Sequence, residues 1–200
     1  MLKTKGFTLV ELIVVVAIVG ILLGLAAPFL TEMIMNARIR NLAGSISNGL
    51  NMAKAEAVRR NVPVRFQLTT TADNTCALSN AGPSWVVSLD NPSDACGSMP
   101  SDNEGPRIIQ VKGNENVERL VMVAAEHTAV FNSIGRQITN AVVDNVISIQ
   151  TTSGPDACAT IANKKGFRCL QINISPGGMV RVCDPAQASK ETRSCTFGSS

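Results

Sequence analysis

The sequence predicts an α+β fold in which one long N-terminal helix packs on an antiparallel β-sheet domain. Two observations carry this prediction. Residues 7–30 are almost continuously apolar and lead into residues 31–60, where apolar side chains recur at helical spacing. From residue 61 onward, short alternating apolar segments are separated by clusters of Gly, Pro, Asn and Asp, which is the pattern of strands and turns. We therefore expect a helical stem and one globular domain, residues 61–200.

Residues 7–30 form the first half of the predicted helix and contain one charged side chain, Glu11. At about 1.5 Å rise per residue they would reach roughly 36 Å, which is enough to cross a bilayer. The preceding segment, residues 1–6, is short and basic, so the positive-inside rule places the N-terminus in the cytoplasm. Pro28 lacks a backbone donor and is predicted to kink the helix. On composition alone, a secretory signal cut near Ala26-Ala27-Pro28 stays open.

The charge at Glu11 needs an explanation, because an ionisable group inside a membrane span costs about 2.5–3.5 kcal/mol. Glu11 ends the run Gly6-Phe7-Thr8-Leu9-Val10-Glu11, which resembles the class III signal of type IV prepilins and type II secretion pseudopilins. The resemblance implies that a prepilin peptidase cuts between Gly6 and Phe7 and methylates the new terminal amine of Phe7. It also implies that Glu11 pairs with the terminal amine of a neighbouring subunit during assembly, which neutralises both charges in an apolar setting.

Residues 31–60 form the second half of the predicted helix, with apolar positions at steps of one, three and four. These positions are Ile39, Leu42, Ala43, Ile46, Leu50, Ala53 and Ala57. They make one apolar stripe, which we expect to pack against the globular domain. The two halves should form a single helix of about 50 residues. Asn61 and Val62-Pro63 should end it, because the residue before a proline disfavours helical backbone.

The globular domain is predicted to be built mainly of strands. Residues 62–68 alternate between apolar and polar side chains, as in a half-buried strand. Further strands are expected at residues 85–89, 107–111, 119–123, 128–131, 145–151, 168–174 and 179–183. Ser175-Pro176-Gly177-Gly178 is predicted to be the hairpin turn between the last two. Residues 71–106 are rich in turn formers and should form long loops with one short strand inside, residues 85–89.

All six cysteines follow the apolar segment, on the side of the membrane expected to be oxidising. An even number there indicates disulfides, although six cysteines allow 15 connectivities that the sequence does not separate. The pairing we expect joins neighbours in sequence: Cys76–Cys96, Cys158–Cys169 and Cys183–Cys195. The chain has no CxxC pair and one histidine, His127, so neither a zinc site nor another metal or cofactor site is predicted.

No catalytic residues are assigned. A phosphate loop, a Rossmann fingerprint and a nucleophile elbow are all absent from the sequence. A lone histidine such as His127 in a strand-rich domain is more often structural than catalytic. The chain is therefore predicted to be a substrate of the peptidase and methylase implied by the Gly6-Phe7 bond, and not an enzyme itself.

Two further segments resemble the FimT/GspH subgroup of minor pilins and pseudopilins, namely residues 129–136 and 174–183. Some pilins of the FimT type bind DNA through a Gly-Arg-x-Arg motif near the C-terminus. The matching residues here are Gly178-Met179-Val180-Arg181, so Met179 replaces the first arginine. Basic residues that could form a small phosphate-binding patch are Arg181, Arg168, Lys164 and Lys165. The alternative without DNA binding is that Arg181 simply faces solvent on an edge hairpin.

The resemblance implies a minor type IV pilin of the FimU/FimT kind, which primes pilus assembly and ends at or near the pilus tip. A GspH-like pseudopilin of type II secretion is the first alternative, and a DNA-binding pilin for transformation is the second. The implied partners are other minor pilins, the major pilin or pseudopilins, the prepilin peptidase, the assembly platform of the inner membrane and membrane lipid. The implied location is a single pass through the inner membrane with a periplasmic domain, followed by the pilus or pseudopilus.

Overall fold

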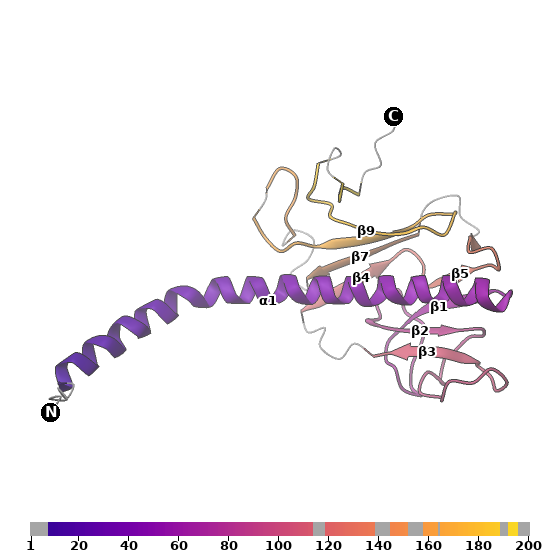
Figure 1. Ribbon diagram of the computed structural model, residues 1–200, viewed down its shortest axis with the longest axis horizontal. Helices are drawn as coiled ribbons and strands as arrows, with labels where there is room; N and C mark the ends of the chain where they lie inside the picture. The colour runs from indigo at the N-terminus through magenta and orange to yellow at the C-terminus, as the bar shows by residue number, and fades with distance from the viewer. Residues whose placement is uncertain are drawn as a thin grey trace, which may run out of the picture. The chain divides into compact units, whose positions relative to one another are not determined.

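The computed structural model describes residues 8–113, 119–138, 145–151, 158–163, 165–188 and 192–195, and within these the side chains of 25–29 are not described. Helix α1 spans Leu9–Arg60, 52 residues, in agreement with the predicted single helix (Figure 1). The chain divides into two compact units, Met1–Met35 and Asn36–Ser200, and each is considered by itself.

The start of α1 is capped by Thr8, the residue that precedes the helix. The Glu11 N–H donates to the Thr8 hydroxyl oxygen at 3.2 Å, and the Leu12 N–H donates to the Thr8 carbonyl at 3.2 Å. A threonine N-cap followed by glutamate three residues later is the sequence pattern of a capping box. The motif of the N-terminal signal therefore also specifies where the helix begins.

Farther along the first unit, α1 runs through the position of Pro28. The side chain of Pro28 lies outside the described set, and the kink stays a prediction. Among the residues that the structure describes, no helix is long and apolar enough to meet the criterion for crossing a membrane.

In the second unit, the predicted apolar stripe of α1 is buried: each of its seven side chains is at most 4 % exposed. The stripe packs on the strands because Gly49 lets the backbone come close, since a Cβ there would lie 2.8 Å from a ring carbon of Phe66. The Trp85 indole N–H donates to the Ser45 hydroxyl at 3.0 Å and so ties the helix to the strands. This half of the helix is thus part of the core of the domain.

The strands form two antiparallel sheets. The five-stranded sheet has the order β3-β2-β1-β5-β6, with β1 Val64–Thr69, β2 Ser84–Ser88, β3 Ile108–Lys112, β5 Thr128–Phe131 and β6 Gln137–Ile138. The four-stranded sheet has the order β4-β7-β8-β9, with β4 Leu120–Ala124, β7 Asn145–Thr151, β8 Leu170–Ile174 and β9 Val180–Cys183. In Figure 1 the second half of α1 runs between β7 and β9 on one side and β1 to β3 on the other.

Every strand predicted from the sequence is present, with bounds that differ by two residues at most. The sequence did not indicate the division into two sheets, which arises because β4 pairs with β7, bringing Met122 opposite Ile149. Strand β6 was not predicted either, since two residues are too few to show a period. The hairpin between β8 and β9 is as predicted, with the Gly178 N–H donating to the Ser175 carbonyl at 2.8 Å.

The two sheets meet at a contact between two turns, residues 132–136 and 175–178, which we call the turn junction. The Gln137 N–H donates to the Pro176 carbonyl at 3.2 Å, and the Lys54 ammonium donates to the Gly178 carbonyl at 2.9 Å. Gly178 has φ +77°, and a Cβ at this position would lie 1.9 Å from the Gly135 carbonyl oxygen. The junction therefore joins α1 and both sheets, and it requires glycine at position 178.

Three disulfides hold the loops and the C-terminal tail: Cys76–Cys96, Cys158–Cys169 and Cys183–Cys195. This is the pairing expected between sequence neighbours. Cys76 and Cys96 are fully buried against Val86 and Ile108, so this bridge continues the core into the two loops that flank β2. Cys183–Cys195 attaches the tail to the end of β9, next to a bridge between Asp184 and Ser194.

The end of α1 carries an ion-pair network centred on Glu56. Its carboxylate accepts hydrogen bonds from Arg59 at 2.7 Å and from Arg60 at 2.6 Å, and Arg60 also pairs with Asp102. The hydrogen bond from Arg59, together with that from Arg60, lowers the pKa of Glu56 from 4.5 to about 2. A carboxylate whose pKa is lowered by folding stabilises the folded state fully at pH values above its ordinary pKa. This stabilisation is lost as the pH falls from the ordinary pKa through the lowered one.

We expect Glu56→Gln to melt at a lower temperature than the native chain at pH 7, and the difference to shrink between about pH 4.5 and pH 2. Thermal unfolding of the full-length protein in detergent micelles, followed by circular dichroism across this range, measures it. Glu104→Gln is the control, because Glu104 is exposed and forms no ion pair with a described residue. A difference independent of pH would contradict the role of the Glu56 charge.

Candidate functional site

The first candidate site is the start of α1, residues 8–24, which we call the assembly segment. Its large apolar side chains between Leu9 and Leu23 are 47–74 % exposed, and its one charged group, Glu11, lies in the first helical turn. Covering such a surface is favourable by about 25 cal/mol per Å² of apolar area removed from water. The segment therefore has the chemistry of a helix that packs against other apolar groups. The predicted cleavage residues Gly6 and Phe7 lie outside the described residues.

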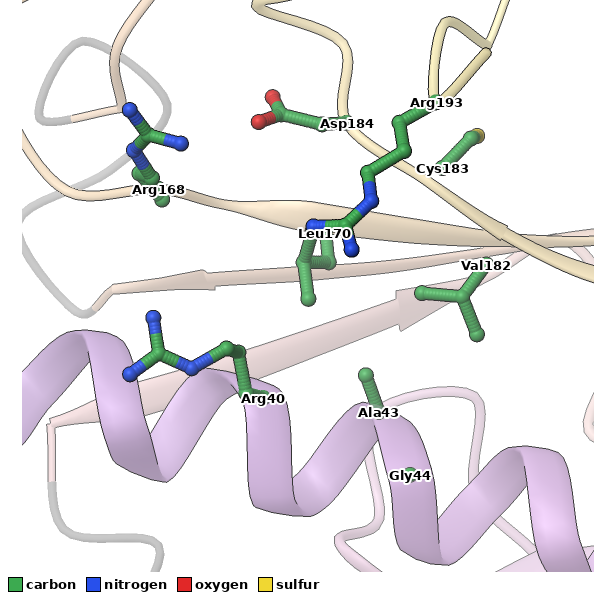
Figure 2. A pocket seen from close by; sticks show the side chains of 9 residues that line it. All are labelled: Arg40, Ala43, Gly44, Arg168, Leu170, Val182, Cys183, Asp184 and Arg193. Atoms are coloured by element: carbon green, nitrogen blue, oxygen red, sulfur yellow. The ribbon is translucent and has the colours of Figure 1, made fainter.

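The second candidate site is a cavity of about 360 Å³ in the second unit, which we call the basic groove. Helix α1 contributes Arg40, Ala43 and Gly44. Strand β8 with the residue two before it contributes Leu170 and Arg168, and β9 contributes Val182. Figure 2 shows these side chains together with Cys183, Asp184 and Arg193, which complete the lining.

Hydrogen bonds to backbone groups hold two of the three groove arginines, Arg168 and Arg193, in place. The Arg168 N–H donates to the Asn36 side-chain oxygen on α1 at 2.8 Å, which fixes the approach to β8. The Asp184 N–H donates to the Arg193 carbonyl at 2.7 Å, beside the Cys183–Cys195 disulfide. The tail is thereby attached to β9, and Arg193 lies at the groove although it is distant in sequence from Arg40.

Of the three basic residues considered for DNA that the structure describes, Arg168 alone lines the groove. Arg181 alternates with Val182 along β9, so its side chain lies on the opposite face of the sheet, where it donates to the Thr192 carbonyl at 2.6 Å. Lys165 is exposed, and Lys164 lies outside the described residues. DNA binding by these four residues stays a prediction.

Sequence reasoning missed Arg40 and Arg193 as site residues. Arg40 reads as one of several polar residues on the outer face of an amphipathic helix, and Arg193 lies in a polar tail without periodicity. No sequence signal places them together, because the described tail reaches the groove through the Cys183–Cys195 disulfide and β9, far along the chain from the helix. The lone histidine, His127, forms a hydrogen bond of 2.8 Å between its ring nitrogen Nδ1 and the hydroxyl oxygen of the neighbouring Thr128. Within the described ranges, no cluster of three metal-ligating side chains occurs.

Two family models match the chain. The prokaryotic N-terminal methylation motif matches residues 1–27, and the model of type II transport protein GspH matches residues 42–178, more than half of the chain. The first match covers the predicted signal around Gly6, Phe7 and Glu11. The second covers most of the globular domain, including the strands of both sheets up to the hairpin turn at Gly178.

Individual relatives are similar to the chain over shorter segments than the GspH model. A 66-residue segment is 40% identical to the pilin-like protein PilA1 of Thermus thermophilus, and a 77-residue segment is 30% identical to the type IV major alpha-pilin of Moraxella bovis. These segments span 33% and 38% of this chain, and 41% and 48% of those relatives, which is less than half of their length.

Among solved structures, two crystal forms of the type IV minor pilin FimU of Pseudomonas aeruginosa resemble the chain, each with a TM-score of 0.47. Their sequence identity to it is 11% and 12%. The similarity covers 79% and 78% of this chain, and 95% and 99% of the FimU chains.

Proposed function

Since the chain belongs to the GspH family of type II transport proteins, we propose that it is a minor pilin that primes assembly of a type IV pilus and remains at or near the pilus tip. Family membership makes it a minor pilin or pseudopilin, which is a structural protein and not an enzyme. Its methylation motif implies anchoring in the membrane before assembly. The observation that carries the proposal is the assembly segment, an apolar helix with one carboxylate in its first turn.

In the proposed mechanism, residues 7–30 hold the subunit in the inner membrane until a peptidase removes residues 1–6. The new amine of Phe7 and the Glu11 carboxylate of an adjacent subunit then neutralise each other, which lowers the cost of placing both charges among apolar helices. The exposed side chains between Leu9 and Leu23 supply the packing surface. The globular domain, built on the buried stripe of α1, stays outside the helical bundle and presents its surface to the other subunits.

A second candidate function is that of a pseudopilin in a type II secretion system. The matched family model, which is described as a type II transport protein, favours it. Both functions use the same cleavage, the same apolar stem and the same kind of β domain. They differ in the machine that the subunit enters, and the phenotype of a deletion separates them.

We expect deletion of the gene to remove surface pili, and the intact gene to restore them. Shearing of surface filaments, followed by immunoblotting and electron microscopy, measures the amount of pili. The matched control is secretion of folded exoproteins by the same strains. Normal pili with lost secretion would reject the priming pilin in favour of the pseudopilin, and normal pili with normal secretion would reject both.

A further inference from the structure

The basic groove contains more positive than negative charge. Its three arginines, Arg40, Arg168 and Arg193, stand against one carboxylate, that of Asp184. Asp184 is 6 % exposed, and one of its oxygens accepts the Ala186 N–H at 2.8 Å. Within the described part of the chain, the three guanidinium groups form no ion pair, since the ion pairs there belong to other arginines. The groove therefore has a positive charge that the described residues of the chain do not neutralise.

The walls of the groove are partly apolar. Ala43 on α1, Leu170 on β8 and Val182 on β9 line it between the arginines. At Gly44 an added Cβ would have no atom within 4 Å, so the helix leaves open space at that point. A site of about 360 Å³ with apolar walls and three arginines fits a few side chains, of which one is acidic and its neighbours are apolar.

From these features we infer that the basic groove binds an acidic peptide segment of a neighbouring subunit. The guanidinium group is planar and donates two parallel hydrogen bonds to a carboxylate, which makes arginine the side chain best suited to hold one. The apolar walls strengthen the attraction because they exclude water from around the charges. This inference rests on the proposed function, since it takes the partner to be another subunit of the same assembly.

The lining favours a peptide over a nucleic acid. The described residues of the groove include no aromatic side chain on which a base could stack. A nucleic acid would also need a row of phosphate contacts along its backbone. The groove instead gathers its arginines around one opening, from a helix, from the approach to a strand and from the tail (Figure 2).

The test is direct coupling of a groove side chain to a carboxylate of its partner. Arg168→Lys and Arg193→Lys keep the positive charge and introduce an amine. A water-soluble carbodiimide joins such an amine to a carboxylate in contact with it. Inner membranes from cells that express the full-length variants are treated, and the coupled peptides are identified by mass spectrometry. We expect an amide between position 168 or 193 and an Asp or Glu of a different chain that carries an N-terminal methylation motif.

Matched variants show whether coupling depends on the charge and shape of the groove or arises from general contact at the protein surface. Arg136→Lys is the control for position, because Arg136 is exposed and lies outside the groove, and we expect several-fold less coupling there. Arg40→Glu should abolish coupling at position 168. Gly44→Phe should also lower it, by filling the groove without changing a charge, whereas Gly44→Ala should leave it unchanged.

Three results would overturn the inference: coupling only to Asp184 of the same chain, equal coupling at position 136, or no coupling to another subunit. Binding of DNA by the full-length protein that is lost with the same three arginines would overturn it in favour of a nucleic acid. The outcome is separable from that of the proposed function. If deletion of the gene removes pili but the expressed variants show no coupling, the groove inference alone is rejected. If the variants couple to another subunit but deletion of the gene leaves pili intact, the priming role alone is rejected.

Discussion

Alanine in place of Glu11 is expected to reduce the amount of this subunit in sheared filaments by about tenfold or more, because removing one partner of a buried ion pair costs about 3–5 kcal/mol. In the proposed assembly the lost partner is the carboxylate that neutralises the Phe7 amine of a neighbour. The measurement is the ratio of the protein in sheared filaments to the protein in membranes, by quantitative immunoblotting of strains with equal total amounts.

The geometry at the start of α1 calls for a second variant at position 11. The Glu11 N–H is bonded to the Thr8 hydroxyl, and glutamine is as suitable as glutamate for a capping box. Glu11→Gln therefore retains the cap and removes the charge. If the charge directs assembly, glutamine should fail as alanine does, while Glu32→Gln, which removes an exposed carboxylate elsewhere on α1, should assemble normally. Assembly of Glu11→Gln at the native level would reject charge pairing and leave helix capping as the role.

Alanine in place of Gly178 is expected to lower the melting temperature of the protein by about 5 °C or more. Two costs add at this position. The left-handed backbone, φ +77°, costs a residue with a Cβ about 1–2 kcal/mol. The Cβ would also lie 1.9 Å from the Gly135 carbonyl oxygen, so the two turns must separate and strain the bonds from Lys54 and Gln137. Thermal unfolding of the oxidised full-length protein in detergent micelles measures the effect.

The adjacent glycine provides the control for Gly178. A Cβ at Gly177 would lie 3.7 Å from the Ser175 hydroxyl oxygen, an ordinary contact, and Gly177 has no left-handed backbone. Gly177→Ala should therefore melt within a degree or two of the native protein. Equal melting of the two variants would show that the turn junction does not contribute to stability as the geometry indicates.

Much of the secondary structure was predictable because its causes are local. The apolar stripe of α1 has a period that depends only on helix geometry, and all of its members are buried. The strands in the globular domain follow from alternation and flanking turn residues. The disulfide pairing agrees with the expected one between sequence neighbours, but the sequence alone did not separate it from the other connectivities, because that choice depends on which loops the fold brings together.

The sequence by itself determined the N-terminal motif, the long helix, the positions of the strands and the family of pilin-like proteins to which they point. Only the tertiary structure decided that β4 pairs with β7 while β5 pairs with β1, which divides the strands into two sheets. It alone placed Gly178 against Gly135 and gathered Arg40, Arg168 and Arg193 around one groove. The physical reason is the same for each: local patterns specify what a segment forms, whereas contacts between distant segments depend on which buried faces pack together.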